Sequence, residues 1–294
     1  MAAVFVTGAT GIVGSAVVRE LQRLGEPVIA AVREPSSNDL PASVTTRRFD
    51  FGLPRPELEK ALEGADRLFL MRPPAIADVQ TTLFPLIDAA NRLGLRQIVF
   101  LSLQGVQANR GTPHHAVEEH LRRTGSPYTF LRPNFFMQNL TTTYAVDIRE
   151  SGRIFVPAGI ARTAFIDARD IGRVAATILT RPGHLHRAHT LSGEQSLTYR
   201  DVARTMTEVL GRPIRYARPS EAEYLDRLRS QGWPEDYIAV QKMIHRVVRL
   251  NVSALPNRSI RRLTGRPATT LAEFVADNRD AWNPQADPGQ RERP

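Results

Sequence analysis

The stretch TGATGIVGS, residues 7–15, constrains the fold more than any other part of the chain. Its three glycines, Gly8, Gly11 and Gly14, follow the apolar run at 4–6, and a helical pattern of apolar residues begins at Ile12. In a strand-to-helix turn of this kind, the glycines allow a tight turn, a close approach to the backbone and close helix packing. The start of the helix then offers unpaired N–H groups and the positive end of a dipole to a diphosphate.

We therefore predict a dinucleotide site at this turn; the alternative is a relic of the fold whose site stays empty. The predicted binding residues of the motif are Thr7, Gly8, Thr10, Gly11, Ile12, Val13 and Gly14.

The first half of the chain alternates short apolar runs with helical patterns. Strands are expected at 4–7, 28–32, 45–49, 67–71, 97–101 and 128–131, and helices at 12–24, 56–62, 77–93 and 114–124. This alternation predicts parallel strand–helix–strand units with right-handed crossovers, and hence a doubly wound parallel sheet of the α/β class. Glycines stand just past the four helices, where a left-handed residue ends a helix: Gly25, Gly64, Gly94 and Gly125.

The pattern changes after Pro133. We expect a strand at 165–167, a helix at 170–179 with Asp170 near its cap, a strand at 189–191, and helices at 198–210, 220–229, 234–248 and 270–281. These features predict a nucleotide-binding domain at 1–155, to which 164–195 returns. They also predict a smaller, mostly helical C-terminal substrate lobe at 196–283 and a disordered tail at 284–294.

Composition narrows the class of protein. The chain has no cysteine, which excludes disulfides and cysteine-ligated metals. No apolar run is long enough to span a membrane, and a strand already begins near Val4, so we expect a cytoplasmic protein with no membrane partner. The net charge of +9 is spread without a block of like charges, which does not favour nucleic-acid binding. We expect a monomer or a homodimer that acts on a small molecule.

The residue after the second expected strand bears on the choice of dinucleotide. Arg33 lies nineteen residues after Gly14, where an arginine would hold the 2′-phosphate of NADP and an acidic residue would hold the ribose hydroxyls of NAD. Arg33 therefore favours NADP(H), while the neighbouring Glu34 leaves NAD(H) open and a solvated loop arginine is the simpler alternative.

The chain resembles the atypical, NmrA-like branch of the short-chain dehydrogenase/reductase superfamily. The matching stretches run through nearly the whole sequence in family order: TGATGIVGS, AAVREP, RRFDF, FLMRPP, FLSLQGV, HHAVEEHLRRTGSPYTFLRPNFFMQN, FIDARDIGRVA and LTGRPATTLAEFVADN. The resemblance implies a Rossmann-type nucleotide-binding fold and an NAD(P)-dependent protein whose branch includes quinone and carbonyl reductases.

The resemblance also implies site residues. It places Asp50 near the adenine, Ser102 near the substrate, and the remaining cofactor contacts at Met71, Arg72, Pro73, Pro133, Asn134 and Phe135. A substrate pocket would involve Phe136, Met137 and Asn139, and Tyr224 is a further candidate for it, although aromatic residues at helical spacing are more often core.

One departure from the superfamily pattern matters for the chemistry. These enzymes usually carry Tyr-x-x-x-Lys on one helix face, where the lysine lowers the pKa of the tyrosine so that it passes a proton. Here the two positions fall on Gly111 and His115, so the usual acid is missing. His115 is a candidate for bonding the nicotinamide ribose or for donating the proton, and Ser102 is the other candidate catalytic residue.

Two functions follow from this pattern. One is an NADPH-dependent reductase of a conjugated carbonyl, a quinone-like compound or a related small molecule, whose delocalised product needs little help from an acid. The other is a non-catalytic NADP-binding sensor, as regulators of this branch are thought to be.

Other patterns weigh little. His184, His186 and His189 lack a carboxylate or cysteine that would complete a metal site, so we expect no bound metal. Asp167 and Asp170 are more typical of a loop anchor and a helix cap than of a catalytic pair.

Overall fold

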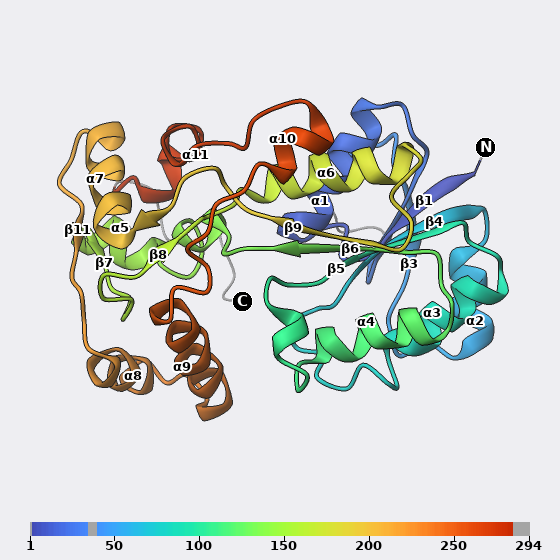
Figure 1. Cartoon of the computed structure of the whole chain (residues 1–294), viewed down its shortest axis with the longest axis horizontal. Helices are drawn as coiled ribbons and strands as arrows, with labels where there is room; N and C mark the ends of the chain where they lie inside the picture. Colours follow the sequence, from blue (N-terminus) through green and yellow to red (C-terminus); the bar gives the residue numbers. More distant parts are fainter. Residues whose placement is uncertain (1, 35–39, 285–294) are drawn as a thin grey trace. The chain divides into compact units, whose positions relative to one another are not determined.

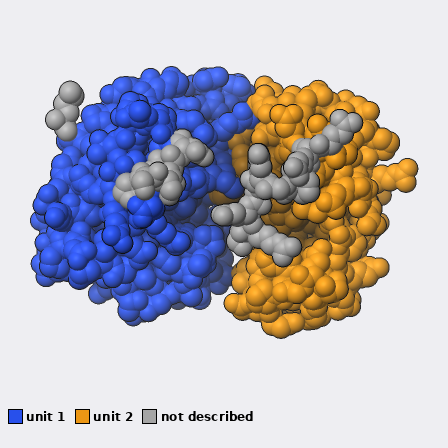
Figure 2. Space-filling model, turned by 180° about the vertical axis from the view of Figure 1, so that it is seen from behind, with its two compact units in different colours: residues 1–134, 168–191, 258–267 blue, residues 135–167, 192–257, 268–294 orange. Residues whose placement is uncertain are grey.

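The computed structural model describes residues 2–34 and 40–284, which form two compact units. Unit 1 consists of the described residues within 1–134, together with 168–191 and 258–267. Unit 2 consists of 135–167, 192–257 and the described part of 268–294. Figure 2 colours the two sets of residues, and each unit is described below by itself.

A parallel sheet forms the centre of unit 1. Its strands are β1 (Ala3–Val6), β2 (Val28–Val32), β3 (Thr45–Arg48), β4 (Ala65–Met71), β5 (Gln97–Leu101), β6 (Tyr128–Pro133) and β9 (Arg187–Leu191). They are ordered β3-β2-β1-β4-β5-β6-β9, and every neighbouring pair is parallel. The order therefore reverses between β1 and β4, as in a doubly wound sheet, which confirms the predicted fold class.

Helices cover both faces of this sheet, as Figure 1 shows. On one face lie α1 (Ile12–Arg23) and α6 (Ala168–Thr180), and α10 (Ser259–Thr264) packs against α6. On the other lie α2 (Arg55–Leu62), α3 (Leu83–Arg92) and α4 (Pro113–Arg123). Helices α1 and α6 approach closely because residue 172 is glycine: a Cβ there would stand 2.6 Å from the backbone carbon of Ala16.

The central strands are buried on both faces. All five residues of β2 and all five of β5 are buried, which explains why these strands are continuous runs rather than alternating patterns. The apolar side chains between the sheet and α2, α3 and α4 form one cluster, including Phe5, Leu68, Ile87 and Phe130. Burial of this kind is the main force that holds the sheet and its helices together.

The four predicted helix-ending glycines are confirmed. The φ angles are +73° at Gly25, +79° at Gly64, +68° at Gly94 and +67° at Gly125. A side chain is strained in this left-handed region, so glycine ends each of these helices at little cost.

One helix begins later than predicted. The pattern indicated a helix over 77–93, but α3 starts at Leu83. The Asp78 carboxylate accepts hydrogen bonds from the backbone N–H of Gln80 and Thr81, at 3.0 Å and 3.3 Å, and from the Thr81 hydroxyl at 2.8 Å. These local bonds hold residues 78–81 in a turn and delay the helix, because they compete with the helical bonds of the backbone.

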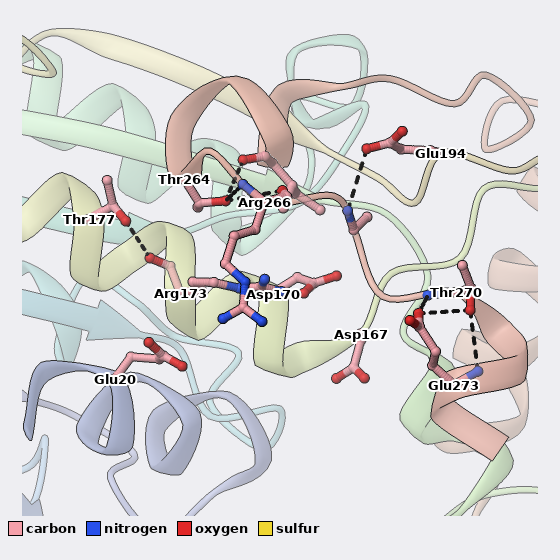
Figure 3. A network of polar contacts seen from close by, with 12 residues as sticks. Glu20, Asp167, Asp170, Arg173, Thr177, Glu194, Thr264, Arg266, Thr270 and Glu273 are labelled. Atoms are coloured by element: carbon pink, nitrogen blue, oxygen red, sulfur yellow. Dashed lines mark hydrogen bonds and ion pairs between the residues drawn. The ribbon is translucent and has the colours of Figure 1, made fainter. Parts of the chain in front are cut away.

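Unit 2 is mostly helical, as predicted for the smaller lobe. Its helices are α5 (Ala145–Ser151), α7 (Tyr199–Leu210), α8 (Glu221–Ser230), α9 (Glu235–Arg249) and α11 (Leu271–Asp277), and its strands are β7 (Arg153–Ile154), β8 (Arg162–Thr163), β10 (Leu197–Thr198) and β11 (Arg215–Tyr216). The strands pair as β10 with β8 and β11 with β7. Figure 3 shows the box at the start of α11, where the Thr270 hydroxyl accepts from the N–H of Glu273 and the Glu273 carboxylate accepts from the N–H of Thr270.

Three expected elements differ in the structure. The expected strand at 165–167 is a single parallel bridge between Phe136 and Ile166. The expected helix at 270–281 ends at 277, where the Asn278 side chain donates to the Phe274 carbonyl at 2.8 Å and a short 3₁₀ turn follows. The helix predicted to begin at Asp170 begins at Ala168, so Asp170 lies in its first turn rather than at its cap.

The predicted domain boundaries differ from the two units. We expected 1–155 to form one domain, but residues 135–155 lie in unit 2. Residues 164–167 and 192–195 also lie in unit 2, whereas 258–267 lie in unit 1. The assignment of a nucleotide domain and a substrate lobe stays a prediction. The predicted tail at 284–294 lies outside the described residues except for its first position.

Candidate functional site

The glycine turn between β1 and α1 has the geometry that its sequence predicts. Gly8 has a φ of +61°, which glycine adopts readily. A Cβ at Gly14 would stand 2.0 Å from the Gly8 carbonyl oxygen, so any side chain there would force the turn apart. The Gly11 N–H donates to the same carbonyl at 2.9 Å. Glycine at 14 therefore lets the helix pack on the turn itself rather than on the strand.

The start of α1 is left open to an anion. Gly11 is the cap residue and makes no side-chain hydrogen bond to the helix, and the first turn carries no acidic residue. The N–H groups of that turn therefore have neither a capping side chain nor a negative charge among the residues of the helix. This arrangement suits a diphosphate, because backbone N–H groups and the helix dipole both favour negative charge.

Thr7 joins this turn to the end of β4. Its N–H and hydroxyl donate to the Phe69 carbonyl at 3.0 Å and 3.1 Å, and the hydroxyl accepts from the Met71 N–H at 2.8 Å. The Met71 side chain lies over the glycines, since its Cε would be 2.3 Å from a Cβ placed on Gly8. The structure thus brings Thr7, Gly8, Gly11 and Met71 together at the point where the strand order reverses.

Two predicted cofactor residues follow β2 and β3. Arg33 is exposed and directly follows β2. Asp50 is exposed two residues after β3, and its carboxylate accepts from the Gly52 N–H at 2.8 Å. Both stand past the carboxyl ends of strands on the β1 side of the reversal, the half of such a sheet that faces the adenosine end of a dinucleotide.

Ser102, the first residue past β5, belongs to a buried ionic cluster. Its hydroxyl donates to the Glu118 carboxylate at 2.7 Å, and Arg132 donates to the same carboxylate from Nε at 2.9 Å and from a second nitrogen. Arg122 donates to it as well, at 2.9 Å. Ser102 is 4% exposed and Glu118 is 1% exposed.

This cluster fixes the protonation of its members. Burial raises the pKa of Glu118, but the hydrogen bonds from Arg132 and Ser102 outweigh it, so the pKa lies below its usual value. Glu118 is therefore ionised at neutral pH, and the Ser102 proton points to a carboxylate. A hydroxyl held in this way offers its lone pairs, not its proton, to a ligand. Nothing in the local sequence pattern around Glu118 or Arg132 marks either residue as part of a site.

The first turn of α4, the helix that follows β5, carries two histidines with different surroundings. The Thr112 hydroxyl caps α4 by accepting from the His115 N–H at 3.2 Å, and the buried Nδ1 atom of His115 has no hydrogen-bond partner within the described residues. Burial, and then the nearby Arg72 charge, lower the pKa of His114 to about 4, so His114 is neutral at neutral pH. Gly111 is exposed and precedes α4, so the two positions of the usual acid pair do not share a helix.

Arg72 is the first residue past β4. One of its terminal nitrogens donates to the carbonyls of Pro73 and Pro74, each at 3.1 Å, and to that of Ile76. Its Nε atom is buried and has no hydrogen-bond partner among the residues that the structure describes. Burial lowers the pKa of this guanidinium.

The other predicted residues divide between the units. Pro133 ends β6, and the Asn134 N–H donates to the Leu191 carbonyl of β9 at 2.8 Å, both in unit 1. The remaining predicted residues all belong to unit 2: Phe135, Phe136, Met137, Asn139 and Tyr224. Within unit 2, Met137 and Tyr224 are buried, and Met137 packs in the main apolar cluster.

Three tyrosines of unit 2 that are far apart in the sequence lie close together in the structure. Tyr144 and Tyr199 lie with ring centroids 6.5 Å apart, and Tyr199 stacks on Tyr216 at 5.8 Å. Burial raises the pKa of both Tyr144 and Tyr199 above the usual value of a phenol. A phenol with a raised pKa gives up its proton less readily, so these tyrosines do not replace the missing acid.

The histidines at 184–189 do not form a metal site with other residues. The rings of His184 and His189 lie 5.7 Å apart, and the nearby charges that act on them are all positive, from His184 on His189 and from arginines on both. Within residues 2–34 and 40–284, no group of three or more His, Asp or Glu side chains is placed to hold a metal ion. In the same ranges, no helix has the length and apolar character needed to cross a membrane.

Comparison with known proteins identifies the family. A model of the NmrA-like family matches residues 2–274. The chain belongs to the NmrA-like family. Among curated relatives, the NAD(P)H azoreductase of Xenophilus azovorans is 34% identical over 280 residues, which cover 92% of this chain and 96% of that protein.

A second curated relative and a solved structure are also similar to this chain. The agroclavine dehydrogenase of Claviceps fusiformis is 33% identical over 229 residues, covering 76% of this chain and 78% of that protein. A crystal structure of an NADPH-dependent quinone oxidoreductase from Escherichia coli, complexed with NADPH, superposes with a TM-score of 0.82 at 26% identity, over 93% of this chain and 99% of that one.

Proposed function

We propose that this NmrA-like protein is an NADPH-dependent reductase of conjugated small molecules, of the quinone, carbonyl or azo type. The observation that carries the proposal is the open helix start beside three glycines at the reversal point of the sheet. Relatives named as an NAD(P)H azoreductase and a quinone oxidoreductase support it. NADP(H) is the expected cofactor, with NAD(H) less favoured because Arg33 follows β2.

The chain's own residues suggest how such a cofactor would be held. Its diphosphate would lie on the N–H groups that begin α1, with the Met71 thioether above the glycine turn. Arg33 would bind the 2′-phosphate. The unpaired Nδ1 atom of His115 would meet a ribose hydroxyl at the other end. When bound, NADPH supplies a hydride; the protein's part is to orient it and to accommodate the charge that forms on the acceptor.

The same geometry limits the choice of acceptor. Ser102 directs its proton to Glu118, and Gly111 stands where an acidic tyrosine would be. The described part of unit 1 thus offers no placed acid of the usual kind for an isolated carbonyl, whose reduction yields a strongly basic alkoxide. Quinones and azo compounds spread the added charge over a conjugated system, so they need less help from an acid. We therefore expect conjugated acceptors to react and simple ketones to fail.

A turnover assay tests this proposal. The purified protein is incubated with NADPH and either a quinone, an azo dye or a simple aliphatic ketone, and the loss of reduced nicotinamide absorbance is followed. The proposal expects turnover with the conjugated acceptors and none with the ketone. Turnover of the ketone at a similar rate would contradict the argument about the missing acid.

A second candidate function, an NADP-binding sensor, is favoured by one observation: the absence of the Tyr-x-x-x-Lys pair at Gly111 and His115. If the protein binds NADPH but no acceptor causes loss of the NADPH absorbance, the result would support the sensor over the reductase. Oligomeric state does not separate the two, and we retain the expectation of a monomer or homodimer.

A further inference from the structure

Arg72 is half-buried, and it differs from Arg67 and Arg132, the two buried arginines of the described residues, in how its charge is balanced. Arg67 pairs with Glu26 and Asp66, each at 2.9 Å, and Arg132 pairs with Glu118. Within residues 2–34 and 40–284, Arg72 forms no ion pair, and its hydrogen bonds go to carbonyl groups alone. A shielded charge without a counter-charge is costly, and buried charges in proteins are normally paired.

Other arginines of the chain also donate hydrogen bonds to backbone carbonyls. Arg72 differs from one of these, Arg47, because its carbonyl partners do not lie at the end of a helix. Arg47 donates to Ala61 and Glu63 at the end of α2, where the helix dipole supplies partial negative charge. The carbonyls that hold Arg72 belong to residues 73–76, which form no helix. They orient the guanidinium firmly while leaving its positive charge uncompensated.

The position of Arg72 indicates what would compensate it. Arg72 follows β4 at the reversal point of the sheet, where ligands bind in folds of this kind. Strand β4 lies beyond the reversal from β1 and pairs with β5, so Arg72 belongs to the half of the sheet that β4 and β5 form. Its charge also acts on His114 at the start of α4. The diphosphate and the adenosine end of a dinucleotide belong to the β1 side, with the glycine turn, Arg33 and Asp50. The β5 side is the reacting half.

We propose that Arg72 receives the negative charge of the second substrate, a planar aromatic acceptor that is anionic or becomes anionic on reduction, and that His114 assists it. This assignment rests on the proposed reductase function and differs from the expected cofactor contact. Hydride addition to a quinone or related conjugated carbonyl, with NADPH as the reductant, breaks a C–H bond of the reduced nicotinamide and a C=O π bond of the acceptor. It forms a C–H or O–H bond on the acceptor, and NADP⁺ is the other product. The displaced electron pair moves onto the remaining oxygen, which becomes an oxyanion. Arg72 stabilises that oxyanion, and water later supplies its proton.

The role explains how this chain dispenses with a tyrosine acid. A guanidinium stays charged at every physiological pH and stabilises an oxyanion without transferring a proton. The neutral imidazole of His114 adds a hydrogen-bond donor without adding charge. Both groups are fixed before the ligand arrives, Arg72 by three carbonyls and His114 by burial, so little reorganisation is needed at the moment of reaction.

Binding of matched ligands tests the proposal without relying on turnover. We would titrate 1-naphthoate and its neutral isostere 1-naphthamide into the protein by calorimetry, with and without NADP. The wild type should bind the carboxylate about tenfold or more tightly than the amide. Arg72→Gln should remove that preference. The control Arg96→Gln, which removes an exposed arginine paired with Asp66, should keep it.

Two further measurements separate the alternatives. NADPH binding should be unchanged in Arg72→Gln, and thermal unfolding of the unliganded variant should occur at the same temperature or higher, since an uncompensated charge has been removed. Equal loss of NADPH and naphthoate binding would assign the charge to a cofactor phosphate and overturn the proposal. A wild type with no preference for the carboxylate would overturn it too. If the wild type binds naphthoate in preference to naphthamide but does not bind NADPH, the result would contradict the reductase function and still support the anion site at Arg72.

Discussion

At the residue scale, the buried carboxylate of Glu118 organises the end of the sheet. It accepts hydrogen bonds from Ser102 after β5, from Arg132 on β6 and from Arg122 on its own helix. A carboxylate that satisfies three donors from three elements fixes their relative positions. It also decides the role of Ser102, because a hydroxyl already donating to a carboxylate is an acceptor toward anything else.

Removing that carboxylate should be costly. Glu118→Gln leaves the buried Arg132 charge unpaired, and we expect a loss of about 3–5 kcal/mol in the free energy of unfolding. The double variant Glu118→Leu with Arg132→Met should lose much less, because neither charge is then left alone. Chemical denaturation of the three proteins measures both values. A single variant as stable as the wild type would show that the cluster contributes little.

The second prediction at this scale concerns Arg33, which the structure leaves exposed just past β2. If it binds the 2′-phosphate, Arg33→Ala should weaken NADPH binding by about 10- to 100-fold, the size expected for one charge-assisted contact, and leave NADH binding unchanged. Calorimetric titration with the two nucleotides makes the comparison. Equal loss for both nucleotides would exclude a role at the 2′-phosphate.

At the element scale, interactions within a few residues explain which helix ends can be predicted from the sequence. The start of α1 and the glycines that end helices follow from backbone preferences that act within a few residues. The late start of α3 was missed because the Asp78 turn overrides an apolar pattern that extends through it. The short helices α5 and α10 were also missed, since a helix of six or seven residues carries too few apolar positions to show a period.

Helix α7 of unit 2 provides a test of such local terms. Thr198 caps it: its hydroxyl accepts from the Asp201 N–H at 3.1 Å, while the Asp201 carboxylate accepts from the Thr198 N–H at 3.0 Å. Thr198→Ala should lower the stability of the protein by about 1 kcal/mol. Thr143→Ala, at an exposed position outside any helix, should change it by less than about 0.5 kcal/mol. If the two variants lose similar amounts of stability in urea unfolding, the cap has no specific role.

At the scale of the whole molecule, the sequence predicted the doubly wound sheet and the glycine turn but not the arrangement of charges around them. The ionic cluster joins Ser102, which follows β5, with Glu118 on α4 and Arg132 on β6, and each residue alone is unremarkable in its local pattern. The same holds for Arg72, whose lack of an acidic partner becomes visible only when the surrounding side chains are placed. Tertiary pairing determines these features, so periodicity and spacing do not reveal them.

Three histidines, the buried His245 and the half-buried His114 and His189, give the molecule a pH-dependent stability. Burial lowers the pKa of His114, His189 and His245 to about 4, from a usual value of 6.5. Between these values the unfolded chain binds protons that the folded chain excludes. Their contribution to stability is therefore fully present above about pH 6.5 and is lost as the pH falls toward 4. The folded protein should lose stability in this window, above the range where carboxylates such as Glu118 titrate.

His245→Phe isolates part of this effect. His245 is 1% exposed, and its two ring nitrogens have no hydrogen-bond partner within the described residues, so the variant removes a proton site without removing a bond. Measured by denaturation at about pH 7 and about pH 5, the loss of stability should be smaller in the variant, by an amount bounded at roughly 3 kcal/mol. Identical pH slopes in the two proteins would refute the assignment to His245.

The central claim is that bare backbone at the start of α1 binds the diphosphate of a pyridine nucleotide. Calorimetric titration of the wild-type protein with NADPH, alongside Gly14→Ala, tests it most directly. We predict saturable one-site binding to the wild type, with a dissociation constant on the order of micromolar, and at least about tenfold weaker binding to the variant, whose Cβ would stand 2.0 Å from the Gly8 carbonyl oxygen. No heat of binding from either NADPH or NADH at about millimolar concentration would contradict the account.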